Sequence, residues 1–264
     1  MEFENYKIMI FTRSMNYILY KASSNTITLP FPRKRLTYTT AEGYLYEILK
    51  YDIDFAINID EDAFVIDNSA LLDLLRYVIK NDYVNCGVRD GGALSIRNGN
   101  PIVTNPFFNI LNVKKIRQSF TIDIVKEYVK NKVDYSHYIP TNLMFEFNVT
   151  DDYEPFYPFF IWLNTSYKTL YLDARQDNDG YTTVVYNHNN KIVLYHSWYS
   201  RMFGVDQFHT KRILNLYNKC TTKSLIFSIR EKIIILFEKF LNEKVIPQVL
   251  PIRRYVLSKI KKND

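Results

Sequence analysis

Residues 54–65 read DFAINIDEDAFV, an apolar stretch interrupted by three consecutive acids at positions 60–62. Residues 54–59 are rich in β-forming side chains and stop where the acids begin, so they predict a buried strand. A second apolar run follows at 63–66. The three carboxylates therefore stand at the end of a strand, which is where open α/β sheets bind their ligands.

Strands and helices are expected to alternate around this stretch. The sequence predicts strands over 7–12, 54–59 and 83–88 and helices over 40–50 and 71–78, with a capping box at Thr39–Glu42. This alternation predicts an α/β fold whose mostly parallel sheet is covered on both faces. Residues 93–115 are interrupted by Gly, Asn and Pro and predict irregular or antiparallel structure. The remaining expected elements are helices over 119–133 and 154–164 and strands over 167–172 and 191–196.

The composition predicts a folded protein that is neither fibrous nor disordered. Of the 264 residues, 47% are hydrophobic and 23% are charged, which is enough apolar material for a packed core. The two cysteines, Cys86 and Cys220, cannot build a disulfide framework, and neither lies in a zinc-binding pattern. We therefore expect a reducing compartment.

The basic charge of the chain is concentrated near its end. Residues 1–210 carry a net charge of −3, whereas residues 211–264 carry +9. A slightly acidic body argues against a nucleic-acid partner. We expect a catalytic domain over 1–218 and a basic, amphipathic helical tail over 219–264. No apolar run approaches the roughly 18 residues of a membrane span, and the start lacks a signal-peptide pattern. This predicts a cytoplasmic protein. For the tail, two interpretations stay open: it contacts the inner face of an anionic membrane as a peripheral element, or it packs on the catalytic domain as a helical cap.

Three residues are candidates for binding a divalent cation. Asp60 and Asp62 offer the oxygen ligands that Mg²⁺ and Mn²⁺ prefer, although an acidic loop that merely solvates a strand end would look the same. His196 closes the apolar run at 191–195 and is followed by polar residues. The alternative for His196 is a histidine held within the core.

The segment 54–65, with the helix expected before it, resembles the metal-binding segment of GT-A glycosyltransferases. Asp60 and Asp62 match the two acids of the DxD motif, which holds Mn²⁺ or Mg²⁺ on a nucleotide-sugar diphosphate. Residues 177–183 and the segment from His196 to Arg201 are similar to the C-terminal part of such enzymes. There the histidine completes the metal site and Arg201 would lie near the diphosphate. The resemblance spans most of residues 5–205 and implies a Rossmann-like three-layer α/β/α domain.

The resemblance also implies further site residues. Glu154, or else Asp152, would act as the general base on the acceptor hydroxyl, although acids at a helix start are also favoured by capping alone. Thr12 and Arg13 are placed as nucleotide contacts. Arg89 and Asp90 would lie where the donor sugar is held, and a plain tight turn is the alternative.

The function expected on these grounds is that of a metal-dependent hexosyltransferase. It would move a sugar from a nucleotide diphosphate, with a UDP-sugar favoured, to a hydroxyl of a glycan or lipid-linked saccharide. Two alternatives stay open. One is a nucleotidyltransferase of similar fold, which would normally carry a Gly-rich loop after the first strand, where residues 12–16 contain no glycine. The other is a non-catalytic adaptor at a membrane surface.

Overall fold

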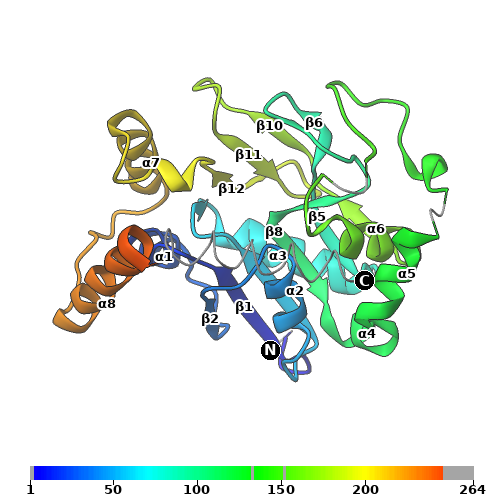
Figure 1. Cartoon of the computed structure of the whole chain (residues 1–264), viewed down its shortest axis with the longest axis horizontal. Helices are drawn as coiled ribbons and strands as arrows, with labels where there is room; N and C mark the ends of the chain where they lie inside the picture. Colours follow the sequence, from blue (N-terminus) through cyan, green and yellow to red (C-terminus); the bar gives the residue numbers. More distant parts are fainter. Residues whose placement is uncertain (1–2, 132–133, 151–152, 246–264) are drawn as a thin grey trace.

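The computed structural model describes residues 3–131, 134–150 and 153–245 (Figure 1). Its centre is a six-stranded sheet in which β8 alone runs antiparallel to its neighbours, β3 and β5. The remaining pairs of this sheet are parallel. The strands, in spatial order, are β2 (Arg33–Leu36), β1 (Ile8–Arg13), β3 (Phe55–Ile59), β8 (Thr104–Asn112), β5 (Asn85–Arg89) and β9 (Thr169–Tyr171). The expected α/β class with a mostly parallel central sheet is confirmed.

Helices cover both faces of this sheet because its strands are apolar on both sides. Alternate residues of β1 enter different cores: Ile8 and Ile10 pack with α3 (Asn68–Lys80), and Phe11 packs on the opposite face. That opposite face is covered by α2 (Gly43–Ile48), α4 (Val113–Ser119), α5 (Ile122–Lys130) and α6 (Tyr157–Ser166). All five residues of β3 are buried. The result is a three-layer α/β/α domain.

A smaller antiparallel sheet continues directly from the central one. It consists of β10 (Ala174–Gln176), β11 (Thr183–Tyr186), β12 (Ile192–His196) and β4 (Ala63–Val65). Because β4 follows β3 after three residues, the acidic triplet 60–62 is the covalent joint between the two sheets. A hairpin of β6 (Gly91–Leu94) and β7 (Arg97–Asn98) forms a third, two-stranded sheet.

The predicted elements are observed with shifted ends, and several others were missed. The capping box expected at Thr39–Glu42 is wrong, because α2 begins only at Gly43 and Glu42 makes no side-chain cap. Residues 93–115 contain the antiparallel strand β8, in agreement with expectation. The elements that the sequence did not predict include α1 (Tyr17–Thr26), β2, α4 and α7 (Gln207–Cys220).

The C-terminal part begins with a helix that belongs to the body. Helix α7 packs through Ile213, Leu216 and Tyr217 on a third core cluster that includes Phe64 of β4. Helix α8 (Ile229–Phe240) then lies beside α1 at one side of the molecule (Figure 1) and is followed by a π-helical turn, Leu241–Val245. The rest of the expected tail lies outside the described residues. Within those residues, no helix is both long enough and apolar enough to span a bilayer.

Candidate functional site

The acidic triplet lies at the point where the strand order of the central sheet reverses. From β1 the chain proceeds to β2 on one side and later to β3 on the other. Ligands of open α/β sheets bind outside the carboxyl ends of the strands at such a switch point. Arg13 ends β1 and Asp60 follows β3, so both stand at this edge.

His196 reaches the triplet through the pairing of β12 with β4. Its register partner is Ala63, the residue after Asp62. The imidazole Nε2 lies 3.1 Å from Asp62 Oδ1, and both side chains are buried. The ring stacks on Phe107 with centroids 4.2 Å apart. Ser197 Oγ donates to the second oxygen, Asp62 Oδ2, at 3.2 Å.

Asp60, Asp62 and His196 bring one ligand atom each to within 4.8 Å of one another. Two carboxylates and one imidazole form a donor set that suits Mn²⁺, and the carboxylates alone suit Mg²⁺. The 3.1 Å between Nε2 and Oδ1 also fits, because adjacent ligands of an octahedral ion with bonds near 2.1 Å lie about 3 Å apart. The residues present therefore fit the metal that the sequence suggested.

The surroundings of Asp60 and Asp62 shift the pKa values of the two carboxyl groups in opposite directions. Burial, followed by the charge of Asp62, raises the pKa of Asp60 to about 6. Burial also opposes ionisation of Asp62, but His196 and the hydrogen bonds from His196 and Ser197 hold its pKa below the ordinary value. The middle acid, Glu61, points elsewhere: its Oε2 accepts from the amides of the loop after β1 at 2.8 and 2.9 Å.

The turn after His196 is held in an unusual backbone conformation. Trp198 and Tyr199 both have positive φ angles, 57° and 58°, which side-chain-bearing residues adopt at a cost of about 1–3 kcal/mol each. Arg212 of α7 stabilises this turn by donating to the Trp198 carbonyl at 3.2 Å. The Trp198 indole donates to Thr183 Oγ1 at 2.8 Å. Strain of this kind concentrates at functional sites.

A cavity of about 210 Å³ opens beside Asp60. Among the residues expected to be functional, it brings Asp60 together with Arg13, Glu154 and Arg201. Arg13 donates weakly to the Thr39 carbonyl at 3.5 Å, and its Nε is buried without a partner among the described residues. Arg201 lies in the 3-10 turn Ser200–Met202 and is exposed. The rest of the lining comprises Ala41, Tyr44, Arg97, Asn105, Pro106, Phe156 and Trp198.

The structure places Thr12 and Arg89 away from this lining. Thr12 Oγ1 is fully buried and accepts from Arg33 Nη2 at 2.7 Å. The Arg89 guanidinium lies 3.4 Å from the centroid of the Tyr171 ring and donates to the Pro101 carbonyl at 2.6 Å. These contacts give both side chains structural partners.

Asp90 and the two candidate bases have different surroundings. Asp90 is fully buried and binds Arg97 Nε at 2.8 Å; burial raises the pKa of Asp90, and the Arg97 charge opposes this. Glu154 lies in the loop before α6, and its Oε1 accepts from Arg97 Nη2 at 2.8 Å. Asp152 lies outside the described residues.

Arg97 is the residue that sequence reasoning missed. It connects buried Asp90 with Glu154 at the cavity wall, and the two acids raise its pKa despite burial. Its position in the β6–β7 hairpin carries no motif. The one available signal was the Gly91–Gly92 pair, which lets the hairpin backbone approach closely: an added Cβ at Gly91 would lie 1.7 Å from the Gly99 carbonyl oxygen.

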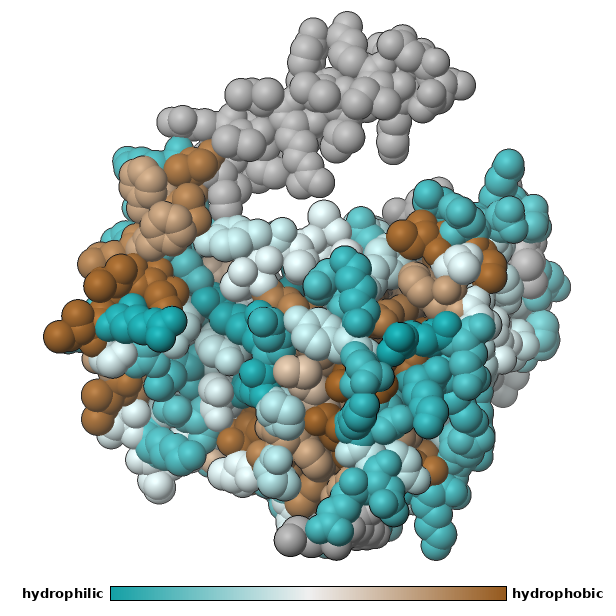
Figure 2. Space-filling model, turned by 90° about the horizontal axis from the view of Figure 1, so that it is seen from below, coloured by the Kyte–Doolittle hydropathy of each residue, from teal (hydrophilic) through white to brown (hydrophobic). Residues whose placement is uncertain are grey.

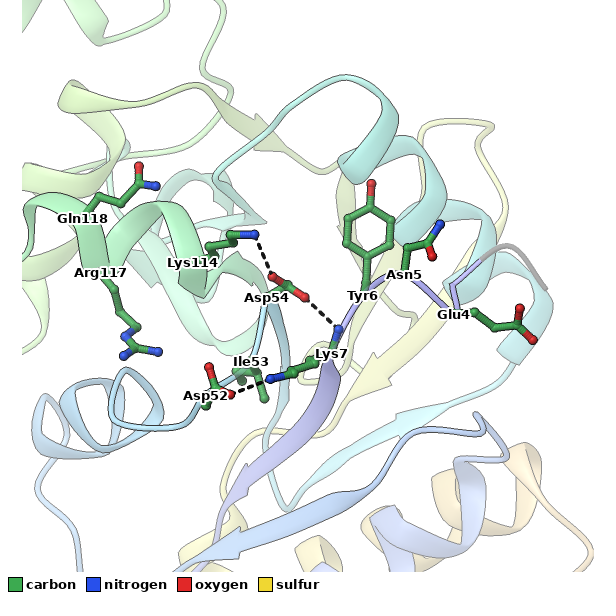
Figure 3. A pocket seen from close by; sticks show the side chains of 10 residues that line it. All are labelled: Glu4, Asn5, Tyr6, Lys7, Asp52, Ile53, Asp54, Lys114, Arg117 and Gln118. Atoms are coloured by element: carbon green, nitrogen blue, oxygen red, sulfur yellow. Dashed lines mark hydrogen bonds and ion pairs between the residues drawn. The ribbon is translucent and has the colours of Figure 1, made fainter.

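A larger hollow of about 630 Å³ lies at the opposite edge of the central sheet (Figure 3). It surrounds the amino ends of β1 and β3, and its charges bind one another. Lys7 Nζ lies 2.5 Å from Asp52, and the Lys7 amide donates to Asp54 at 2.8 Å. Lys114 Nζ lies 3.5 Å from Asp54. The smaller cavity, beside Asp60, is therefore the candidate functional site.

No family model matches the chain, and neither does any curated protein. Among solved structures, A197 from STIV is similar at 12% identity and a TM-score of 0.37, over 71% of this chain and 93% of that one. A mannosyltransferase from Pyrobaculum calidifontis, in complex with GDP-Man and Mn²⁺, is similar at 7% identity and a TM-score of 0.39, over 98% of this chain and 76% of that one. At these scores the class rests on the strand order, the antiparallel β8 and the acids after β3. These features define a Rossmann-like three-layer α/β/α domain with a mostly parallel central sheet.

Proposed function

We propose that the protein is a metal-dependent glycosyltransferase that moves a sugar from a nucleotide diphosphate to an acceptor hydroxyl. The observation that carries this proposal is the convergence of Asp60, Asp62 and His196 at the switch point, beside a cavity that also receives Arg13 and Arg201. Carboxylates for a cation and guanidinium groups for phosphate oxygens are the two requirements of a nucleotide-diphosphate site.

In this proposal the leaving group is stabilised from two sides. Asp60, Asp62 and His196 would hold Mn²⁺ or Mg²⁺. As a Lewis acid, the cation would stabilise the negative charge that develops on the departing diphosphate by several kcal/mol. Arg201 is exposed at the rim and can bind phosphate oxygens through two of its guanidinium nitrogens. Arg13 has a buried Nε that lacks a partner among the described residues, and a diphosphate oxygen would satisfy it.

Glu154 is the candidate base for the acceptor hydroxyl if the reaction inverts the anomeric centre. It lines the cavity, and Arg97 fixes the position of its Oε1, leaving Oε2 to take the proton. If the reaction retains the configuration, Glu154 would instead bind the acceptor. Asp152 stays the second choice on sequence grounds. The proposed donor is a UDP-sugar, and the proposed acceptor is a glycan or a lipid-linked saccharide. The proposed catalytic unit comprises residues 1–218.

A nucleotidyltransferase fits the structure less well. Such enzymes cradle a triphosphate with backbone amides at the start of the first helix. Here the amides of residues 15–19 already donate to acceptors of the protein itself. Glu61, Glu238 and Asn16 accept from them at 2.8–3.3 Å.

The first experiment is a thermal-shift titration with UDP and GDP in the presence of Mn²⁺ or chelator. We expect the diphosphate to raise the melting temperature with Mn²⁺ and much less with chelator. Asp62→Asn should lose this effect, whereas the matched control Asp123→Asn, on an exposed carboxylate of α5, should keep it. Equal shifts with Mn²⁺ and chelator would contradict a metal-dependent donor site, and no shift in either condition would favour the adaptor alternative.

A second experiment tests transfer itself. UDP- and GDP-sugars are incubated with a panel of saccharide acceptors, and release of the nucleoside diphosphate is measured. We expect release to require Mn²⁺ or Mg²⁺ and to fall by at least about a hundredfold in Asp62→Asn. Metal-dependent binding without any release would leave the site as a nucleotide-sugar binder and argue against transfer.

A further inference from the structure

Helix α8 is attached to the body by its acidic residues. Glu231 Oε1 accepts from Lys21 Nζ at 2.7 Å and from the Tyr17 hydroxyl at 3.1 Å. Two turns later Glu238 binds Arg35 Nη1 at 2.5 Å and the Tyr17 amide at 2.8 Å. Ser228 caps the helix in a full capping box with Glu231. The polar side of α8 is therefore the side that faces the protein.

The opposite side of α8 is apolar and exposed. At about 100° per residue, the side chains at 229, 233, 236, 237 and 240 fall within roughly 100° of one another, on the side away from Glu231 and Glu238. We call these five residues, together with Ile226 just before the helix, the apolar face. Their exposed fractions are 75% for Ile226, 79% for Ile229, 62% for Ile233, 67% for Leu236, 57% for Phe237 and 56% for Phe240.

The exposed charges that border the apolar face within α8 itself are basic. Arg230, Lys232 and Lys239 are exposed and project from its two borders, roughly 70–110° from its centre. The acids within α8 are Glu231 and Glu238, and both are bound to the body. The next acid, Glu243 in the π-helical turn, is exposed and lies 3.9 Å from Lys239, so Arg230 and Lys232 are the cations of this border that have no acidic partner within the helix. An exposed apolar stripe bordered by cations is the pattern of a helix that lies in the interface of an anionic bilayer.

The apolar face is separate from the candidate functional site. Figure 2 shows it as a brown area at the edge of the molecule where α8 lies. No residue of α8 lines the cavity beside Asp60. Among the described residues, the core clusters likewise include no apolar side chain of α8. A contiguous apolar area of this kind on a folded protein marks an interaction surface.

We propose that the apolar face of α8 docks on the surface of an anionic lipid bilayer. The ion pairs of Glu231 and Glu238 fix the helix with this face outward, so Ile, Leu and Phe side chains enter the acyl boundary. Arg230, Lys232 and Lys239 then meet the lipid phosphates. The proposal stands apart from glycosyl transfer, because it uses none of the residues at the cavity.

The test is co-sedimentation of the full chain with vesicles of phosphatidylcholine alone or with roughly 30 mol% phosphatidylglycerol, which gives the surface a negative potential. We expect binding to the anionic vesicles that weakens as salt rises from about 0.1 to 0.5 M. Ile233→Ser/Phe237→Ser should lower the partition coefficient about tenfold or more. The matched control, Ile122→Ser/Ile124→Ser, alters exposed side chains of α5 and should bind like the wild type. Thermal melting establishes that each variant is folded.

Three results would overturn the proposal. Equal binding by both double variants would place the lipid contact elsewhere. A dimer that dissociates in Ile233→Ser/Phe237→Ser, without vesicle binding by the wild type, would assign the face to a second copy. Binding by a chain ending at residue 245, but not by the full chain, would assign it to contacts with residues 246–264.

Discussion

Asp62 and His196 form a buried pair whose two members depend on each other. Their side chains are only 3% and 4% exposed, so neither can turn to water when the other is removed. Breaking such a pair strands a polar group or charge, whereas replacing both partners by apolar residues is often neutral. This dependence can be measured in the metal-free protein.

We predict that His196→Leu lowers the free energy of unfolding by about 3–5 kcal/mol in the presence of chelator, because the Asp62 carboxylate loses its partner. The double variant Asp62→Leu/His196→Leu should recover part of this loss. Urea unfolding of the four proteins of this cycle gives the coupling energy. A loss below about 1 kcal/mol in the single variant, with no coupling, would mean that the two side chains do not pair in solution.

Arg97 holds the buried carboxylate of Asp90 in a similar way. Arg97→Met keeps the length of the side chain but leaves fully buried Asp90 without its cation, so unfolding should become easier by about 3–5 kcal/mol. Lys50→Met is the matched control, because its pair with Glu47 is largely exposed and should contribute at most about 1 kcal/mol. Equal effects in urea unfolding would show that Asp90 is not held as a buried anion.

The attachment of α8 to the body should weaken in acid. The hydrogen bonds from Lys21 and Ser228 lower the pKa of Glu231 from 4.5 to about 2. A folded pKa below the unfolded one means that the contribution is complete above about pH 4.5 and is lost as the pH falls toward 2. Helix α8 should therefore loosen in that window.

We expect the amides of 229–240 to lose protection from hydrogen exchange between pH 5 and 3, after correction for intrinsic rates, while those of β3 stay protected. Glu231→Gln should show weaker protection already at pH 6 and a smaller change with pH. Unchanged protection of α8 down to pH 3 in the wild type would contradict this attachment.

The sequence predicted the elements whose burial follows a simple period. The runs that became β1, β3 and β12 are continuous apolar stretches, and α3 repeats its buried leucines at helical spacing. Helix α1 was missed because its buried face is formed by Leu19 and small or polar residues, which hides the period. Strand β2 has the sequence Arg-Lys-Arg-Leu, which lacks the apolar pattern of a strand. Charged side chains are accepted there because β2 lies at the edge of the sheet.

The site could be predicted as far as strand ends determine it. Asp60, Asp62 and His196 each close or follow an apolar run, so their meeting at one sheet edge follows from the topology. The bridge from Arg97 to Glu154 could not be predicted, because it joins a hairpin to a loop 57 residues later. The partners of Thr12 and Arg89 come from β2 and β9, whose places in the sheet also depend on the whole fold.

Helix α8 is joined to the body mainly through the ion pairs of Glu231 and Glu238. We predict that a chain ending at residue 227, which keeps Leu225 on the third core cluster, melts only slightly below the full chain, since it loses the ion pairs of Glu231 and Glu238 while their partners Lys21 and Arg35 become accessible to water. Leu216→Ala, in α7, should cost more, about 2–5 kcal/mol, because it opens a cavity in the third core cluster. Calorimetry of the two variants shows which of them has the lower melting temperature. The reverse order would mean that α8 contributes to the core.

The side chains of the triplet that joins the two sheets alternate in direction, so the number of residues in this joint matters. Asp60 and Asp62 turn to one side and Glu61 to the other, where it holds the loop after β1. Removing or adding a single residue here would exchange these directions: a glutamate would enter the metal centre, and the loop would lose its acceptor. The number of residues in the joint is thus as constrained as their identity. Relatives of this chain should vary freely in the length of the segment between β11 and β12, and never by one residue between β3 and β4.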